Sequence, residues 1–233
     1  MKTANEFLTF KKELKPYYSN VMQFNKIVRG ADKAVNDEES VYQILDAGFI
    51  CHIAFQHEEQ TMVIPTAYGR KGDALYIHGS TKNYMLNQII NCKSMCIGVT
   101  HLDGIVLART LFDTSANYHS VVLFGKAELV SDHDDRMEGL RIITENIIKG
   151  RWNEVSVGSQ NQLKATMVVK FTIDKASAKI RDGGPKGDEE NLHEVWSGHI
   201  PLSLKASEPV MDPKFGVKLT MTKSVIDFWE RHR

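Results

Sequence analysis

Short apolar runs recur along the chain at strand spacing, and turn residues separate them. The first four runs cover residues 49–55, 62–64, 74–77 and 94–101. The later runs cover residues 105–109, 121–130, 165–173 and 176–181. Closely spaced strands joined by turns favour an antiparallel barrel over a doubly wound parallel sheet. We therefore expect an α+β protein that is mainly β with flanking helices.

Turn chemistry predicts how these strands connect. Arg70-Lys71-Gly72-Asp73 is a four-residue turn that would join the second and third runs into a hairpin. Further turns are expected at residues 102–104 and 174–175, with a polar loop at residues 113–120. Gly125 interrupts a long apolar run and predicts a bulge. Residues 49–55 are dense in aromatic and β-branched side chains, which predicts a buried strand.

Helical spacing occurs at four places. Residues 36–39 predict an N-cap with Glu at the third helical position, and Gly48 would end that helix. A second helix begins near Lys82, and residues 132–148 form an amphipathic helix with an acidic first turn. A terminal helix is expected within residues 221–233. The expected organisation is an N-terminal arm over residues 1–35, a central domain over 36–205, and a C-terminal tail with a short helix over 206–233.

The stretch His78-Gly79-Ser80-Thr81-Lys82, between a strand and a helix, is the strongest candidate for a binding site. It offers a flexible backbone, two hydroxyls, one cation and a helix N-terminus, which are the groups that bind a phosphate monoester. Each hydrogen bond to such a dianion contributes roughly 1.5–3 kcal/mol. The alternative is that Ser80 and Thr81 only cap the helix. The pattern alone leaves both interpretations open.

Composition narrows the function classes. Lys plus Arg and Asp plus Glu both total 29, so the formal net charge is zero. This balance gives no electrostatic case for binding nucleic acid or an anionic membrane. No apolar run reaches bilayer length and residues 1–15 show no signal-peptide core, so we expect a cytoplasmic protein. Three cysteines are an odd and sparse set, which argues against a disulfide framework, and no metal site is predicted.

Six sequence blocks in a fixed order carry a family resemblance. They cover residues 42–48, 64–69, 75–80, 103–109, 115–122 and 195–202. These blocks resemble the pyridoxamine 5′-phosphate oxidase-related flavoproteins, and they are closest to the branch that contains the nitroimidazole reductases. The similarity covers residues 25–205. It implies an antiparallel split β-barrel, of the FMN-binding type, that holds FMN at a homodimer interface, with FAD as the other possible flavin.

The resemblance implies roles for individual residues on the cofactor side. It places the flavin against the backbone of Ile64, Pro65, Thr66 and Ala67, and it places Ile77 and His78 beside the ribityl chain. The phosphate would lie on the loop already singled out, at Gly79, Ser80, Thr81 and Lys82. Lys82 is the single cation there, whereas the oxidases hold this phosphate with several Arg and Lys residues.

The resemblance also assigns residues outside this loop. Asn117 and Ser120 fall where related proteins contribute polar contacts from the partner subunit or to the ring edge. Trp196 resembles a C-terminal aromatic residue near the cofactor. His78 is the candidate catalytic residue, because the nitroimidazole-reductase branch has a histidine at this position. The alternative is a strand-end histidine bonded to backbone.

Two classes of function are therefore expected. The first is an FMN-dependent oxidoreductase that passes electrons from a reduced nicotinamide or another donor to a small organic acceptor through the flavin. The second is a flavin-binding carrier, sensor or redox buffer without turnover. A haem-binding split barrel ranks a distant third, because His52, His101 and His119 show no recognisable ligand pattern.

Overall fold

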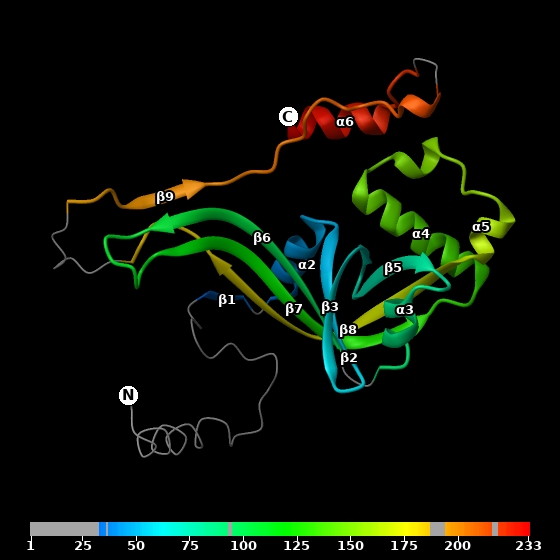
Figure 1. Ribbon diagram of the computed structural model, residues 1–233, viewed down its shortest axis with the longest axis horizontal. Helices are drawn as coiled ribbons and strands as arrows, with labels where there is room; N and C mark the ends of the chain where they lie inside the picture. Colours follow the sequence, from blue (N-terminus) through cyan, green and yellow to red (C-terminus); the bar gives the residue numbers. More distant parts are fainter. Residues whose placement is uncertain (1–32, 36, 93–94, 187–193, 216–218) are drawn as a thin grey trace.

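The computed structural model describes residues 33–35, 37–92, 95–186, 194–215 and 219–233. Its strands form one nine-stranded, antiparallel sheet (Figure 1). The strands are β1 (Ala34–Val35), β2 (Ile50–His57), β3 (Gln60–Ala67), β4 (Gly69–Lys71), β5 (Ala74–Ser80), β6 (Met95–Leu107), β7 (Ser115–Leu129), β8 (Thr166–Arg181) and β9 (Gly198–Pro201). The described helices are α2 (Glu38–Asp46), α3 (Tyr84–Ile89), α4 (His133–Ile147), α5 (Gln160–Lys164), α6 (Lys223–His232) and the 3-10 turns η2 (Arg151–Glu154) and η3 (Pro213–Phe215).

The sheet is open, and its opening is the feature that positions the candidate site. The strand order is β3-β2-β6-β7-β8-β5-β4, with β1 beside β8 and β9 beside β6. Among the described residues, β3 pairs only with β2 and β4 pairs only with β5. The sheet nevertheless curls far enough for β3 and β5 to contact one another. This confirms the expected split β-barrel, and we call the gap between β3 and β5 the seam.

The hydrophobic core lies on one face of the curled sheet, beneath α2 and α3. Alternate residues of each strand enter it, for example Ile53 of β2, Ile97 of β6 and Leu123 of β7, all fully buried. On the other face α4 covers the β8-β5 end of the sheet. A side chain at Gly139 would meet Val168 and Tyr76 at 2.8 and 3.1 Å, which explains glycine at this helix position.

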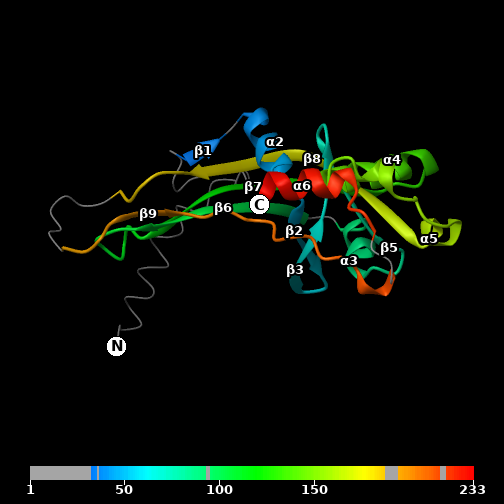
Figure 2. The same ribbon diagram turned by 90° about the horizontal axis from the view of Figure 1, so that it is seen from above.

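Three long strands extend as a single arm away from the barrel (Figures 1 and 2). The turns expected at residues 102–104 and 174–175 are wrong, because β6 and β8 are continuous strands across these residues. At both places the register shifts by one residue instead, so each is a bulge. The bulge predicted at Gly125 is confirmed. A Cβ there would lie 1.9 Å from the Thr172 carbonyl oxygen, so only glycine fits.

Other local predictions also need correction. The hairpin between residues 62–64 and 74–77 is wrong, because β3 pairs with β2, while the two-residue turn at Gly72 joins β4 to β5. The polar loop expected at residues 113–120 becomes strand from Ser115 onward. The strand at residues 49–55 is buried on one face only, and His52 is exposed on the other. The N-cap of α2 is Asp37, whose carboxylate accepts a hydrogen bond from the Ser40 amide at 2.8 Å.

The helices predicted at residues 132–148 and 221–233 are confirmed as α4 and α6. Residues 1–32 of the expected N-terminal arm lie outside the described residues. In the part of the chain that the structure describes, no helix is both long and apolar enough to cross a bilayer.

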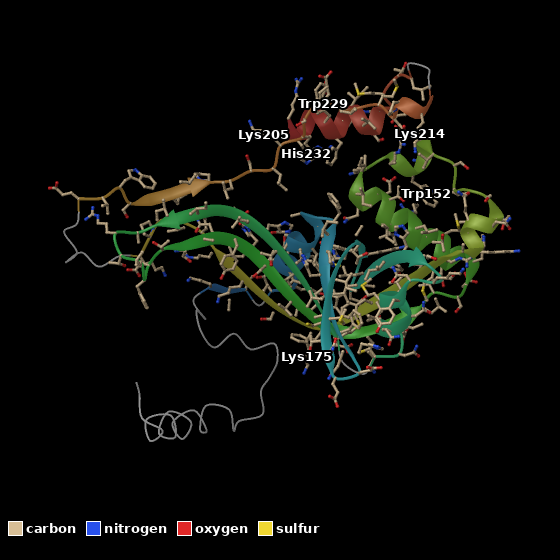
Figure 3. All side chains as sticks on the ribbon, in the orientation of Figure 1. Trp152, Lys175, Lys205, Lys214, Trp229 and His232 are labelled. Atoms are coloured by element: carbon tan, nitrogen blue, oxygen red, sulfur yellow. The ribbon has the colours of Figure 1, made fainter. Side chains whose placement is uncertain are left out.

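Hydrogen bonds to the Glu154 side chain connect α6 to η2. The carboxylate accepts hydrogen bonds from the Ser224 amide at 2.9 Å and the Ser224 hydroxyl at 2.5 Å. Figure 3 labels Trp152 on η2 and Trp229 on α6, the two elements that meet here. Hydrogen bonds from Ser224 and then Thr222 lower the pKa of Glu154 from 4.5 to about 2. The ionised carboxylate therefore stabilises the docked position of α6.

Replacing Glu154 with Gln should loosen α6, because a neutral amide accepts more weakly than a carboxylate. We expect faster amide hydrogen exchange in residues 223–232. The stabilisation is complete above pH 4.5 and is lost as the pH falls toward 2, since the folded-state pKa is the lower one. Glu230→Gln on the exposed side of α6 is the control, and equal exchange in both variants would contradict the role of Glu154.

Candidate functional site

The seam brings together the two stretches that the sequence assigned to the cofactor. Ile64, Pro65, Thr66 and Ala67 form the end of β3, and residues 77–80 form the end of β5. Pro65 has no amide proton to donate, which is tolerated because β3 is an edge strand. Beyond Tyr76, the end of β5 pairs only with β8 among the described residues. Both stretches therefore offer backbone groups to a molecule that lies in the seam.

The loop after β5 is built differently from the sequence prediction. The amides of Thr81, Lys82 and Asn83 donate to the Ala165 carbonyl at 2.9 Å, the Ser80 hydroxyl at 3.2 Å and the Ser80 carbonyl at 2.8 Å. The predicted set of free amides is therefore wrong. The predicted capping by Ser80 and Thr81 is also wrong, because Asn83 caps α3 through the Leu86 amide at 3.0 Å.

What this loop offers a ligand is its side chains. Ser80, Thr81 and Lys82 are all exposed, and Ser80 lies one residue beyond Gly79 at the end of β5. Two hydroxyls and one ammonium group thus share a short loop at the rim of the seam. We call Ser80, Thr81 and Lys82 the anchor loop. Its chemistry suits a phosphate group, held by hydroxyl donors and one point charge.

His78 and Ile77 point to opposite faces of β5. The Ile77 side chain is fully buried in the core, so only its backbone can contact a ligand. Gly79 shares that face, where a Cβ would meet a Leu86 methyl at 2.9 Å. The His78 side chain reaches solvent on the other face, yet desolvation by the surrounding protein lowers its pKa below 6.5. This shift favours the neutral form of the His78 imidazole.

Asn117 and Ser120 lie on the arm, far from the anchor loop of the same chain. Ser80 pairs with Thr166 of β8, whereas Ser120 pairs with Lys179, thirteen residues later in that strand. At about 3.3 Å per residue this is on the order of 40 Å along the strand. These two residues therefore cannot complete the anchor loop within one chain.

Asn117 has a visible structural role. It is 3% exposed; its amide nitrogen donates to the Gly183 carbonyl at 3.0 Å, and its oxygen accepts from Arg181 at 2.6 Å. Sequence reasoning missed Arg181, a buried cation at the end of β8. Its pairing depends on strand register, which no local motif encodes.

Trp196 is 64% exposed and lies just before β9. Its ring covers Gly198, where a Cβ would meet ring atoms at 2.9 and 3.0 Å. β9 pairs with residues 104–107 of β6, so Trp196 also belongs to the arm. Within one chain, the structure brings together residues 64–67 and 77–82, and it places Asn117, Ser120 and Trp196 elsewhere.

The open barrel with its seam defines the split-barrel class of flavin-binding proteins. Residues 37–180 match the family model described as pyridoxamine 5′-phosphate oxidase, and the chain belongs to this family. A search of curated proteins finds no match.

Two solved structures resemble nearly the whole chain. The flavocytochrome Anf3 from Azotobacter vinelandii is 31% identical, with a TM-score of 0.82 over 88% of this chain and 96% of that one. The FAD and heme binding protein from Mycobacterium smegmatis is 30% identical, with a TM-score of 0.79 over 84% of this chain and 96% of that one. A candidate 5-nitroimidazole antibiotic resistance protein from Bacteroides thetaiotaomicron, 21% identical with a TM-score of 0.52 over 63% of this chain and 86% of that one, shares the fold alone.

The double substitution Ser80→Ala with Lys82→Ala should weaken flavin binding. Losing one hydroxyl and one charged contact costs about 3 kcal/mol, or roughly 100-fold in Kd. Titration of the apoprotein with flavin, followed by quenching of flavin fluorescence, measures the change. Lys126→Ala with Ser131→Ala, at exposed positions outside the seam, is the matched control. Unchanged affinity in the first variant would place the phosphate elsewhere.

Proposed function

We propose that this protein binds a flavin nucleotide in the seam and uses it in redox chemistry. The observation that carries the proposal is the convergence of the β3 end, the β5 end and the anchor loop on one gap in the sheet. Backbone groups of residues 64–67 and 77–78 would face the ring and the ribityl chain, and the anchor loop would hold the phosphate. The flavin itself supplies the electron chemistry, while the chain positions it and limits water access.

Which flavin the protein binds, FMN or FAD, is a separate proposal. The family resemblance implies FMN. FAD is the second candidate, since each phosphate of its diphosphate carries one negative charge and the anchor loop supplies one cation. The description of the Mycobacterium relative also names FAD. Chromatography of the flavin released by denaturing the purified protein identifies it directly.

We further propose a homodimer in which the arm of each chain completes the seam of the other. Asn117, Ser120 and Trp196 lie too far from the anchor loop of their own chain to act there. Large apolar side chains on the arm and barrel are exposed, among them Val63 at 60% and Leu102 at 57%. Their burial against a second copy would stabilise such a dimer.

Leu102→Glu should separate the dimer, because it buries a charge in the proposed interface. We expect sedimentation velocity to change from a two-chain to a one-chain species, with loss of bound flavin. Val157→Glu, at an exposed apolar position in the loop before α5, should leave the mass and the flavin content unchanged. A flavin-loaded monomer would contradict the shared seam.

Haem binding is a second candidate function. The sequence alone ranked it a distant third, and the similar solved structures favour it more strongly. The two solved structures compared above each cover more than four fifths of this chain, and they are described as a flavocytochrome and as an FAD and heme binding protein. The family model alone covers only residues 37–180, so these similarities extend beyond it. We therefore propose a protein with two redox cofactors.

Anaerobic addition of NADH or NADPH to the flavin-loaded protein separates an oxidoreductase from a carrier. We expect bleaching of the flavin absorbance with at least one donor. No bleaching with either nucleotide would contradict nicotinamide-dependent turnover and favour a carrier, sensor or redox buffer. His78→Ala should slow the reduction rate without changing flavin affinity if the neutral imidazole contacts the substrate.

A further inference from the structure

A cleft lies away from the seam, between α2 and the neighbouring strands β6, β7 and β8. Its volume is about 440 Å³, within the range of roughly 300–1,000 Å³ for small-molecule sites. Apolar side chains of Ile44, Ala47 and Ile180 line it together with His101, Asp103 and His119. None of its lining residues belongs to β3, β5 or the anchor loop. The cleft is therefore separate from the seam of its own chain.

Two histidines face each other across the strands of this cleft. His101 of β6 and His119 of β7 are direct partners in the antiparallel register, and Ile180 of β8 is next in the row. Side chains that are directly opposed in this way have Cβ atoms about 4.5–5.5 Å apart. Both imidazoles lie on the face of the sheet that α2 covers, because both line the cleft beside this helix.

His119 has the arrangement of a metal ligand. Its Nδ1 atom is hydrogen-bonded to the Asp103 carboxylate, and its side chain is 41% exposed. A carboxylate on one ring nitrogen fixes the tautomer and orientation of a ligating histidine and leaves the other nitrogen for the metal. The nitrogen available in the cleft is thus Nε2 of His119.

His101 has a different role in the same cleft. Its Nε2 atom is hydrogen-bonded to the Ile44 carbonyl at 2.9 Å, so the ring is fixed to the end of α2. The ring also fills the space beside Gly48, where a Cβ would lie 2.5 Å from its Cε1 atom. His101 therefore forms part of the cleft wall.

The number of protein side chains that could bind a metal distinguishes a free metal ion from a haem iron. Within the described residues, no group of three or more His, Cys, Asp or Glu side chains is placed to hold a metal ion. A haem iron already has four nitrogen ligands and needs only one or two from the protein. A cleft that places the apolar side chains of Ile44, Ala47 and Ile180 beside one oriented imidazole fits that requirement.

We propose that Nε2 of His119 would bind the iron of a haem held in this cleft, and that Asp103 is the positioning residue for the imidazole. This inference rests on the proposed haem-binding function. Ile44, Ala47 and Ile180 would contact the apolar macrocycle, and polar groups of α2 at Ser40 and Gln43 border the cleft.

The test is reconstitution of the full-length, flavin-loaded protein with haemin, followed by absorbance titration of the Soret band. We expect His119→Ala to weaken haem binding at least ten-fold with unchanged flavin content, and added imidazole to restore the Soret band. His133→Ala is the matched control, because His133 also pairs with an aspartate, Asp134 at 3.0 Å, but lies on the exposed start of α4. We expect this control to bind haem like the parent protein.

Each other outcome overturns a different statement. A parent protein that holds flavin but no haem removes the haem function itself. Parent-like haem affinity and spectrum in His119→Ala leave haem binding intact and overturn the assignment of the ligand. Loss of both cofactors from His119→Ala, with an unchanged circular dichroism spectrum, assigns the cleft to the flavin instead.

Asp103→Asn tests the positioning residue separately. A carboxylate raises the basicity of its imidazole, and a more basic ligand favours the ferric state. We expect the variant to retain haem and to show a more positive reduction potential. An unchanged potential with parent-like haem affinity would overturn the role of Asp103.

Discussion

The seam between β3 and β5 is the constraint on which the site depends. A sheet edge presents unpaired amides and carbonyls, and these groups need partners. In this protein the sheet curls until β3 contacts β5 without pairing with it, so the free edge of β3 and the end of β5 beyond its pairing with β4 flank one gap. Bulges at Leu102/Gly104 and Phe124/Gly125 allow the long strands to bend while they continue into the arm. The same strands thus build the barrel and extend beyond it.

The element types were largely predictable from the sequence, but their pairing was not. Apolar alternation identified most strands, and the amphipathic spacing of residues 132–148 identified α4. The errors occurred where a polar pair such as Asp174-Lys175 resembles a turn but forms a bulge. The glycine at position 125 was informative, since its lack of a side chain is required by the Thr172 carbonyl oxygen. β3 pairs with β2 rather than β5 because a two-residue turn at Glu58-Glu59, with Glu58 at a positive φ of 53°, joins the two strands, and no Gly or Asn marks that turn in the sequence.

The candidate site was predictable to a similar extent. The anchor loop could be found because hydroxyls and a lysine follow a strand end, yet its backbone amides are already bonded within the chain. The sequence could not show that His101 and His119 are strand partners, since a turn at residues 102–104 would separate them. Once β6 is seen to be continuous, His101 and His119 are opposite one another. The two proposed sites, one at the seam and one beneath α2, agree with relatives described as a flavocytochrome and as an FAD and heme binding protein.

Subunit complementation tests most directly whether the seam of one chain is completed by the arm of another. One subunit would carry Ser80→Ala with Lys82→Ala, and the other Ser120→Ala with Trp196→Ala. Neither homodimer should hold flavin tightly, but unfolding and refolding them together should produce mixed dimers with one intact seam each. We predict recovery of about a quarter of the parent flavin content, since about half of the dimers are mixed and each contributes one of two sites. No recovery, with mixed dimers demonstrated by distinct tags, would contradict the shared site.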